Sequence, residues 1–180
     1  IALYRRPDGT FETLRTATNF GTFPISLALG ELNGVGIPDL LTGNNFYLQI
    51  FLGTGGRSFV YTSQLRVVNY PKSLAITDMN GDGKADIVAG GSLGLGVFFG
   101  RGAGVFNAQV VTNGGGTLKI LRDVNRDGTM DAIVAGNGVA IFLGDRLGHF
   151  SKAGEVSGIS NAFAKAVAAG DIDQDGRLDL

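Results

Sequence analysis

Three short loops of the chain carry acidic side chains in the pattern D-x-[DN]-x-D-G-x-x-D. Calcium takes six to eight oxygen ligands at about 2.3 to 2.6 Å, and alternate positions of a tightly curved loop aim their oxygens at one point. Positions one, three, five and nine offer side-chain oxygens here, while position seven offers its backbone carbonyl. The pattern predicts three calcium sites, whose ligands are Asp78, Asn80, Asp82, Lys84 and Asp86; Asp123, Asn125, Asp127, Thr129 and Asp131; and Asp171, Asp173, Asp175, Arg177 and Asp179.

Ordinary turns and an EF-hand are two other interpretations of these loops. Asp-Gly and Asn-Gly clusters also form ordinary turns, but three loops in register argue against turns alone, because converging carboxylates repel each other without a cation. An EF-hand would need a glutamate at position twelve, where Ala89 and Val134 stand instead, and its flanks would be helical. The sixth-position glycines, such as Gly83, suit the sharp turn of a metal loop in either fold.

A fourth loop has the same length but a weaker set of ligands. It contains Glu31, Asn33 and Asp39, with Val35 at the fifth position and Pro38 before the last acid. We expect this loop to be empty of metal or to bind it weakly.

The four loops mark an internal repeat. They begin at Glu31, Asp78, Asp123 and Asp171, which gives a period near 47 residues, and such periods are typical of repeat architectures. A short apolar segment precedes each loop, another follows it, and a third ends in FLG or FFG before a more polar fourth segment. The runs are short, rich in Val, Ile, Leu and Phe, and without helical periodicity, so each repeat predicts four strands.

The predicted fold is therefore all-β: a β-propeller of four-stranded antiparallel blades, with about four blade equivalents in the chain. A β-solenoid is the rival, but its coils normally have a shorter period. We expect one propeller region over residues 1–180, with repeats near residues 25–70, 73–116 and 117–160 and partial repeats at 1–24 and 161–180. The ends are out of phase, which favours part of a larger ring over a four-bladed ring closed by the two ends.

Composition narrows the classes of function. Glycine is 30 of 180 residues, yet apolar residues reach 44% and charged ones 17%, which indicates a folded chain. The formal net charge is −1 with scattered Lys and Arg, so nucleic acid is not expected as a partner. No apolar run reaches the roughly eighteen residues of a membrane span. Cysteine is absent, which removes thiolate chemistry.

The metal pattern, the IVAG that follows it and the FLG or FFG strand with a Gly-x-Phe turn together resemble the FG-GAP/VCBS repeats of integrin-α-like propellers. The resemblance is specific at residues 78–90 and 123–136, partial at 171–180 and degenerate at 31–43. It implies calcium loops and typically seven blades. It also implies a role in adhesion, in sugar binding, or as an accessory or catalytic part of a secreted carbohydrate-active enzyme.

Strand parity places the metal loops on one face of the propeller and the other connections on the opposite face. Aromatic rings beside amides on that face suit recognition of sugars or peptides. Turn geometry alone is the competing explanation for these residues. The candidate ligand-binding residues are Phe46, Tyr47, Asn69, Tyr70, Asn113 and Phe163.

We assign no catalytic residue, because the chain lacks a nucleophile elbow and His149 lies in a hairpin turn. The first hypothesis is a calcium-stabilised binding or adhesion module for carbohydrate or protein. A propeller domain of a secreted, lyase-like carbohydrate-active enzyme and a purely structural extracellular element are the alternatives. Weak calcium sites stay filled only at millimolar calcium, which indicates an extracellular, cell-surface or periplasmic location.

Overall fold

The computed structural model describes residues 2–14, 24–56, 58–67, 70–114, 116–156 and 164–180. Every regular element in these ranges is a β-strand, so the all-β prediction is confirmed. None of the described segments forms a helix long and apolar enough to cross a membrane. The candidate residues Asn69 and Phe163 lie outside the described ranges.

Three four-stranded antiparallel sheets form the body of the described chain. Blade 1 consists of β3 (Ser26–Gly30), β4 (Asp39–Gly43), β5 (Tyr47–Gly53) and β6 (Phe59–Arg66). Blade 2 consists of β7 (Pro71–Thr77), β8 (Asp86–Gly91), β9 (Gly94–Phe98) and β12 (Val110–Asn113). Blade 3 consists of β13 (Thr117–Arg122), β14 (Asp131–Gly136), β15 (Gly138–Gly144) and β16 (Phe150–Glu155). In each blade the strands pair in chain order, as the sequence predicts.

Two short hairpins accompany the blades. One pairs β1 (Ala2–Arg5) with β2 (Phe11–Leu14), and the other pairs β10 (Gly100–Gly102) with β11 (Val105–Phe106) between the third and fourth strands of blade 2. A single bridge joins Gly170 to Asp179 near the C-terminus.

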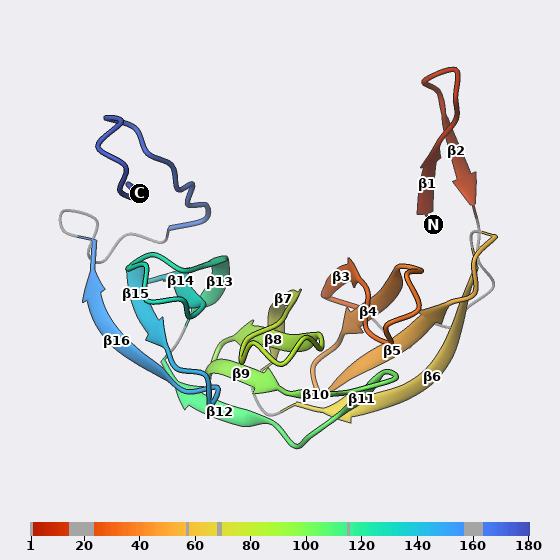
Figure 1. Cartoon of the computed structure of the whole chain (residues 1–180), viewed down its shortest axis with the longest axis horizontal. Coiled ribbons are helices and arrows are strands. Elements are labelled where there is room, and N and C mark those ends of the chain that lie inside the picture. Colours follow the sequence, from red (N-terminus) through yellow and green to blue (C-terminus); the bar gives the residue numbers. More distant parts are fainter. Residues whose placement is uncertain (1, 15–23, 57, 68–69, 115, 157–163) are drawn as a thin grey trace.

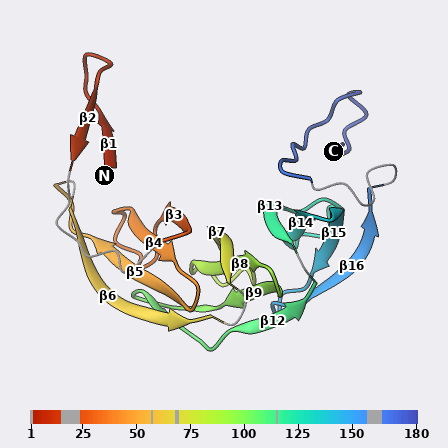
Figure 2. The ribbon, with the colours of Figure 1, turned by 180° about the vertical axis from the view of Figure 1, so that it is seen from behind.

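The blades stand side by side along an arc, with the first strand of each blade toward the inside and the fourth toward the outside (Figure 1). The β1–β2 hairpin and the C-terminal segment lie at the two ends of this arc, as the view from behind also shows (Figure 2). This is the radial arrangement of a propeller. The described residues do not form a closed ring.

The core lies between neighbouring blades. Strand β8 shows why its sequence is a continuous apolar run: Ile87 and Ala89 pack with blade 1, while Val88 between them packs with blade 3. Successive side chains of a strand point to opposite faces, and here both faces are covered. A blade therefore depends on its neighbours for its hydrophobic burial.

Among the residues that the structure describes, no neighbouring blade covers one face of the first strand of blade 1. Leu27 and Leu29 are 67% and 62% exposed. The corresponding residues of blade 2, Leu74 and Ile76, pack against the core that blades 1 and 2 share. The difference follows from the position of blade 1 at one end of the arc.

Candidate functional site

The four acidic loops share one backbone conformation. Three of them join the first strand of a blade to the second, and the fourth is closed by the bridge between Gly170 and Asp179. The fourth and sixth positions have positive φ in every loop. The fourth-position residues are Gly34, Gly81, Arg126 and Gln174, and the sixth-position residues are Gly36, Gly83, Gly128 and Gly176. The loop at Glu31 has the same shape as the others although its fifth position is Val35. The turn is thus a property of the repeat and does not depend on the full acidic set.

Hydrogen bonds from the backbone curl each loop around its own side chains. In the loop of blade 2, Asn80 Oδ1 accepts a hydrogen bond from the Asp82 amide at 2.9 Å, and Asp82 Oδ1 accepts one from the Lys84 amide at 2.9 Å. Asp78 Oδ2 accepts from Gly83 N at 2.8 Å. These successive Asx turns hold the side-chain oxygens of alternate positions close to the loop. The loop's own backbone therefore holds the side-chain oxygens that the pattern predicts as ligands.

Hydrogen bonds within the loops lower the pKa of two of the exposed acids, Asp82 and Asp127. The bond from the Lys84 amide lowers the pKa of Asp82, although burial acts in the other direction. In the loop of blade 3, hydrogen bonds from the side chains of Thr129 and Asn125 lower the pKa of Asp127, and the nearby charge of Arg146 adds to this effect. Ionised carboxylates are the form that binds a divalent cation.

The ninth-position aspartate has a second role that the pattern alone did not indicate. Asp86 is fully buried; its Oδ2 accepts from Met79 N at 2.8 Å and its Oδ1 from Gly100 N at 2.7 Å. The same pair of bonds, from the second loop residue and from the end of the third strand, occurs at Asp39 and at Asp131. This carboxylate fastens the loop to the third strand, and each oxygen keeps a second lone pair.

A glycine at the end of β5 and of β15, and at the start of β10 just after β9 in blade 2, explains the recurring FLG and FFG. A Cβ on Gly100 would lie 2.2 Å from the carbonyl oxygen of Ala85. On Gly53 and Gly144 the corresponding distances, to the carbonyl oxygens of Pro38 and Met130, would be 2.3 and 2.1 Å. Only glycine lets the third strand approach the loop closely enough to donate to the buried aspartate.

The donor set of the C-terminal loop fits calcium, and among the described residues this loop alone brings three carboxylates together. Asp171, Asp173 and Asp179 offer carboxylate oxygens that all lie within 4.8 Å of one another. Glu31 Oε2 is buried and has no hydrogen-bond partner among the described residues, as expected of an oxygen placed for a cation. The positions hold hard oxygen ligands, the kind that calcium prefers.

The structure brings two of the candidate ligand-binding residues together on the face opposite the loops. The rings of Phe46 and Tyr70 have centroids 5.9 Å apart and are tilted by 53°. Phe46 is 56% exposed and Tyr70 42% exposed, and Tyr47 is also partly exposed. Asn44 Oδ1 shapes the turn by accepting hydrogen bonds from the amides of Phe46 and Tyr47.

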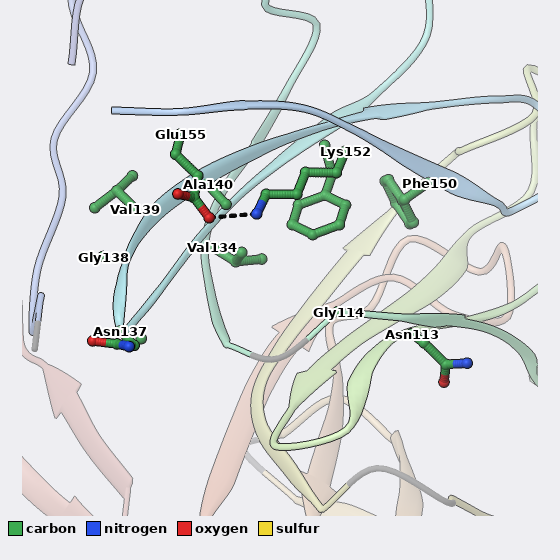
Figure 3. Close-up of a pocket in the computed structure, with 12 residues that line it drawn as sticks. Asn113, Gly114, Val134, Asn137, Gly138, Val139, Ala140, Phe150, Lys152 and Glu155 are labelled. Atoms are coloured by element: carbon green, nitrogen blue, oxygen red, sulfur yellow. Dashed lines mark hydrogen bonds and ion pairs between the residues drawn. The ribbon is translucent and has the colours of Figure 1, made fainter. Parts of the chain in front are cut away.

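Asn113 belongs to a different place on the same face, a recess of about 230 Å³ between the end of β12 and blade 3 (Figure 3). Its other polar lining residues are Asn137, Lys152 and Glu155, and the last two form an ion pair. Phe150 contributes part of the apolar wall. These partners could not be predicted from the sequence, because the residue pattern of the polar fourth strand does not indicate which side chains face the neighbouring blade.

The radial blades and their acidic loops define a repeat protein with a propeller-like arrangement of four-stranded sheets. The profile of the FG-GAP-like repeat matches residues 31–89 and 123–180, and the chain belongs to this family. The resemblance inferred from the loops and the FLG or FFG strands is thereby confirmed. No curated protein sequence matches the chain.

The solved structures that are similar to the chain include two from different kinds of protein. One describes the specific recognition of non-reducing terminal N-acetylglucosamine by an Agrocybe aegerita lectin; the likeness has a TM-score of 0.51 at 20% identity and covers 77% of this chain and 38% of the lectin. The other is the Photorhabdus luminescens Tc holotoxin pore, with a TM-score of 0.45 at 20% identity over 86% of this chain and 8% of that one. The chain thus spans less than half of either, and the lectin supports the fold alone.

Proposed function

We propose that the chain is a calcium-stabilised extracellular binding module that recognises carbohydrate on the face opposite its metal loops. The recess beside Asn113 carries this proposal. Two amides and a charged pair beside an apolar wall suit the hydroxyl groups and the apolar face of a sugar ring. Its volume is below the roughly 300 to 1,000 Å³ of sites for drug-sized ligands, which favours a single sugar unit.

Calcium binding in the acidic loops is the second part of the proposal. The oxygens that backbone hydrogen bonds hold within the loops support it, and so do the clustered carboxylates of Asp171, Asp173 and Asp179. FG-GAP-like repeats are typical of extracellular proteins, where millimolar calcium would fill sites of modest affinity.

Completion of the ring is the third part. The exposed leucines of β3 occupy positions that are packed against a preceding blade in blade 2. Covering Leu27 and Leu29 would remove a large apolar patch from water, so a further blade of the same kind is the natural neighbour of this face.

A glycan array in calcium buffer tests the binding site. Asn113→Ala and Asn137→Ala each remove an amide from the recess and should weaken glycan binding at least about tenfold, since unpaired polar groups remain on the sugar. Ser92→Ala serves as the control, because Ser92 is exposed in the β8–β9 turn on the same face and does not line the recess. Unchanged binding by both amide variants would contradict the site. Turnover of a polysaccharide would instead support the enzyme alternative.

A protein ligand is the second candidate, and the exposed Phe46–Tyr70 pair favours it. Aromatic side chains are enriched among the residues that dominate protein interfaces. Phe46→Ala should then abolish capture of a protein partner while leaving glycan binding unchanged. Loss of glycan binding in this variant would place the sugar at the aromatic pair and not at Asn113.

A further inference from the structure

Basic side chains lie beside the fifth-position carboxylates of the metal loops. Lys84 Nζ is 3.2 Å from Asp82 Oδ2, and Arg177 Nε is 3.9 Å from Asp175 Oδ2. In both loops the base stands at position seven, whose backbone carbonyl, and not its side chain, is the expected ligand. The side chain is therefore free to act as a counter-ion.

The loop of blade 3 has Thr129 at position seven, and the basic side chain beside this loop comes from a different element. Arg146 lies in the turn between β15 and β16. A Cβ on Gly128 would be 3.6 Å from Arg146 Nη2, and one on Gly81 would be 3.9 Å from Nη1. The guanidinium group thus reaches the metal loops of blades 2 and 3 together.

The turn that carries Arg146 is held by its neighbour. Asp145 Oδ1 accepts hydrogen bonds from the amides of Leu147 and His149, both at 2.8 Å. Asp145 is thereby engaged within its own turn, and Arg146 is directed to the loops.

The degenerate loop of blade 1 provides an internal comparison. It has Val35 at position five and Ile37 at position seven, so the acid and the base are both missing. The other three loops each keep an acid at position five together with a nearby cation. A basic side chain thus lies beside each of the loops that has a carboxylate at position five.

We propose that Lys84, Arg146 and Arg177 are resident counter-ions that stabilise the calcium-free loops and set the calcium affinity by competing with the metal. Arg146 does this for two adjacent loops at once. The inference rests on the proposed calcium binding. A calcium ion that binds must displace these basic side chains or be repelled by them. Their removal therefore favours the calcium-bound loop and destabilises the calcium-free loop.

The test is calorimetric calcium titration of the 180-residue chain, combined with thermal unfolding in excess chelator. Arg146→Gln should raise the calcium affinity of two sites about two- to fivefold, the range expected when an exposed ion pair is removed. The gain should shrink as salt is raised, because the charges are screened. In chelator the same variant should unfold at a lower temperature than the wild type.

Arg101→Gln is the matched control. It removes the same charge from an exposed position of the β10–β11 hairpin of blade 2, whose Gly104 amide donates to the Leu32 carbonyl of the degenerate loop, and should leave affinity and unfolding unchanged. Equal or lower affinity in Arg146→Gln would overturn the counter-ion role, because a residue that only supports the loop loses affinity when it is replaced. Absence of calcium binding in the wild type would instead overturn the proposed metal sites together with this inference.

Discussion

At the scale of single residues, the loops were the most predictable part of the chain. Their acids and glycines lie within nine consecutive positions, so spacing alone indicates a curved, oxygen-rich turn. The fastening role of Asp86 could not be predicted in this way. Its partner Gly100 is fourteen residues away, and their meeting depends on where the third strand ends relative to the loop.

Replacement of Asp86 by alanine tests this role. Both amides that it accepts from, those of Met79 and Gly100, would lose their partner at a fully buried position. Hydrogen bonds to a charged group contribute about 1.5 to 3 kcal/mol, so Asp86→Ala should destabilise the fold by about 3 kcal/mol or more. Urea unfolding in chelator separates this loss from any loss of metal.

Asp82→Ala is the control for that experiment. Asp82 is an exposed loop acid whose carboxylate accepts bonds only within its own loop. In chelator its removal should change the free energy of unfolding by less than about 1 kcal/mol. Equal losses in the two variants would show that Asp86 is no more than another loop acid.

Asp145 gives the pH dependence at this scale. Burial acts to raise its pKa, but hydrogen bonds from the amide and ring of His149 and from the Leu147 amide outweigh this, and the pKa is lowered. Its stabilising contribution is present above the unfolded pKa of about 3.9 and is lost as the pH falls through the lower folded value. Asp145→Asn should therefore flatten the acid limb of a stability curve measured in chelator. A limb of unchanged steepness would contradict this assignment.

At the scale of strands and blades, the apolar runs and the turns between them predicted four strands per repeat, and three complete blades have them. Blade 2 departs from the pattern. Along the chain, its β10–β11 hairpin lies between β9 and β12, which pair with each other in the sheet. The hairpin has a register shift between Gly100 and Gly102. A local break of this kind depends on hydrogen-bond register between strands, which residue types alone do not fix.

Gly100→Ala tests why the third strand must end in glycine. The added methyl group would meet the carbonyl oxygen of Ala85, and that backbone cannot move without disturbing the loop. Overpacking of this kind costs about 1 to 3 kcal/mol, which thermal unfolding would detect. Gly154→Ala is the control, since no atom lies within 4 Å of its added Cβ; it should be neutral or slightly stabilising. Equal stability of the two variants would mean that the close approach in FLG and FFG carries no cost.

At the scale of the whole molecule, each hydrophobic cluster joins neighbouring parts of the arc. The pair of blades 1 and 2 and the pair of blades 2 and 3 each share a core, and Ala164 and Val167 of the C-terminal segment pack against blade 3. The sequence predicted this radial stacking from the period and the two-sided apolar strands. The angle between neighbouring blades could not be predicted from the sequence, because it depends on how the side chains of the two blades pack together.

Calcium should stabilise much of the arc, since the intact loops precede the second strands of blades 2 and 3 and lie in the C-terminal segment. With site affinities near 0.1 mM, about 1 mM free calcium contributes up to about 1.4 kcal/mol per site. Three filled sites would raise the free energy of unfolding by about 4 kcal/mol and the midpoint temperature by roughly 8 to 16 °C. Thermal unfolding in calcium and in chelator measures this shift, and calorimetry counts the sites.

Two variants separate the intact loops from the degenerate one. Combined replacement of Asp78, Asp123 and Asp171 by asparagine should abolish most of the calcium-dependent shift, because the first ligand of each loop loses its negative charge and one of its two oxygens. Glu31→Gln should leave about three sites, since its loop lacks an acid at position five. A loss of one site in Glu31→Gln would assign metal to the loop of blade 1 as well, consistent with the buried Oε2 of Glu31. No shift and no binding heat in the wild type would leave the four loops as turns, whose shape the backbone hydrogen bonds alone maintain.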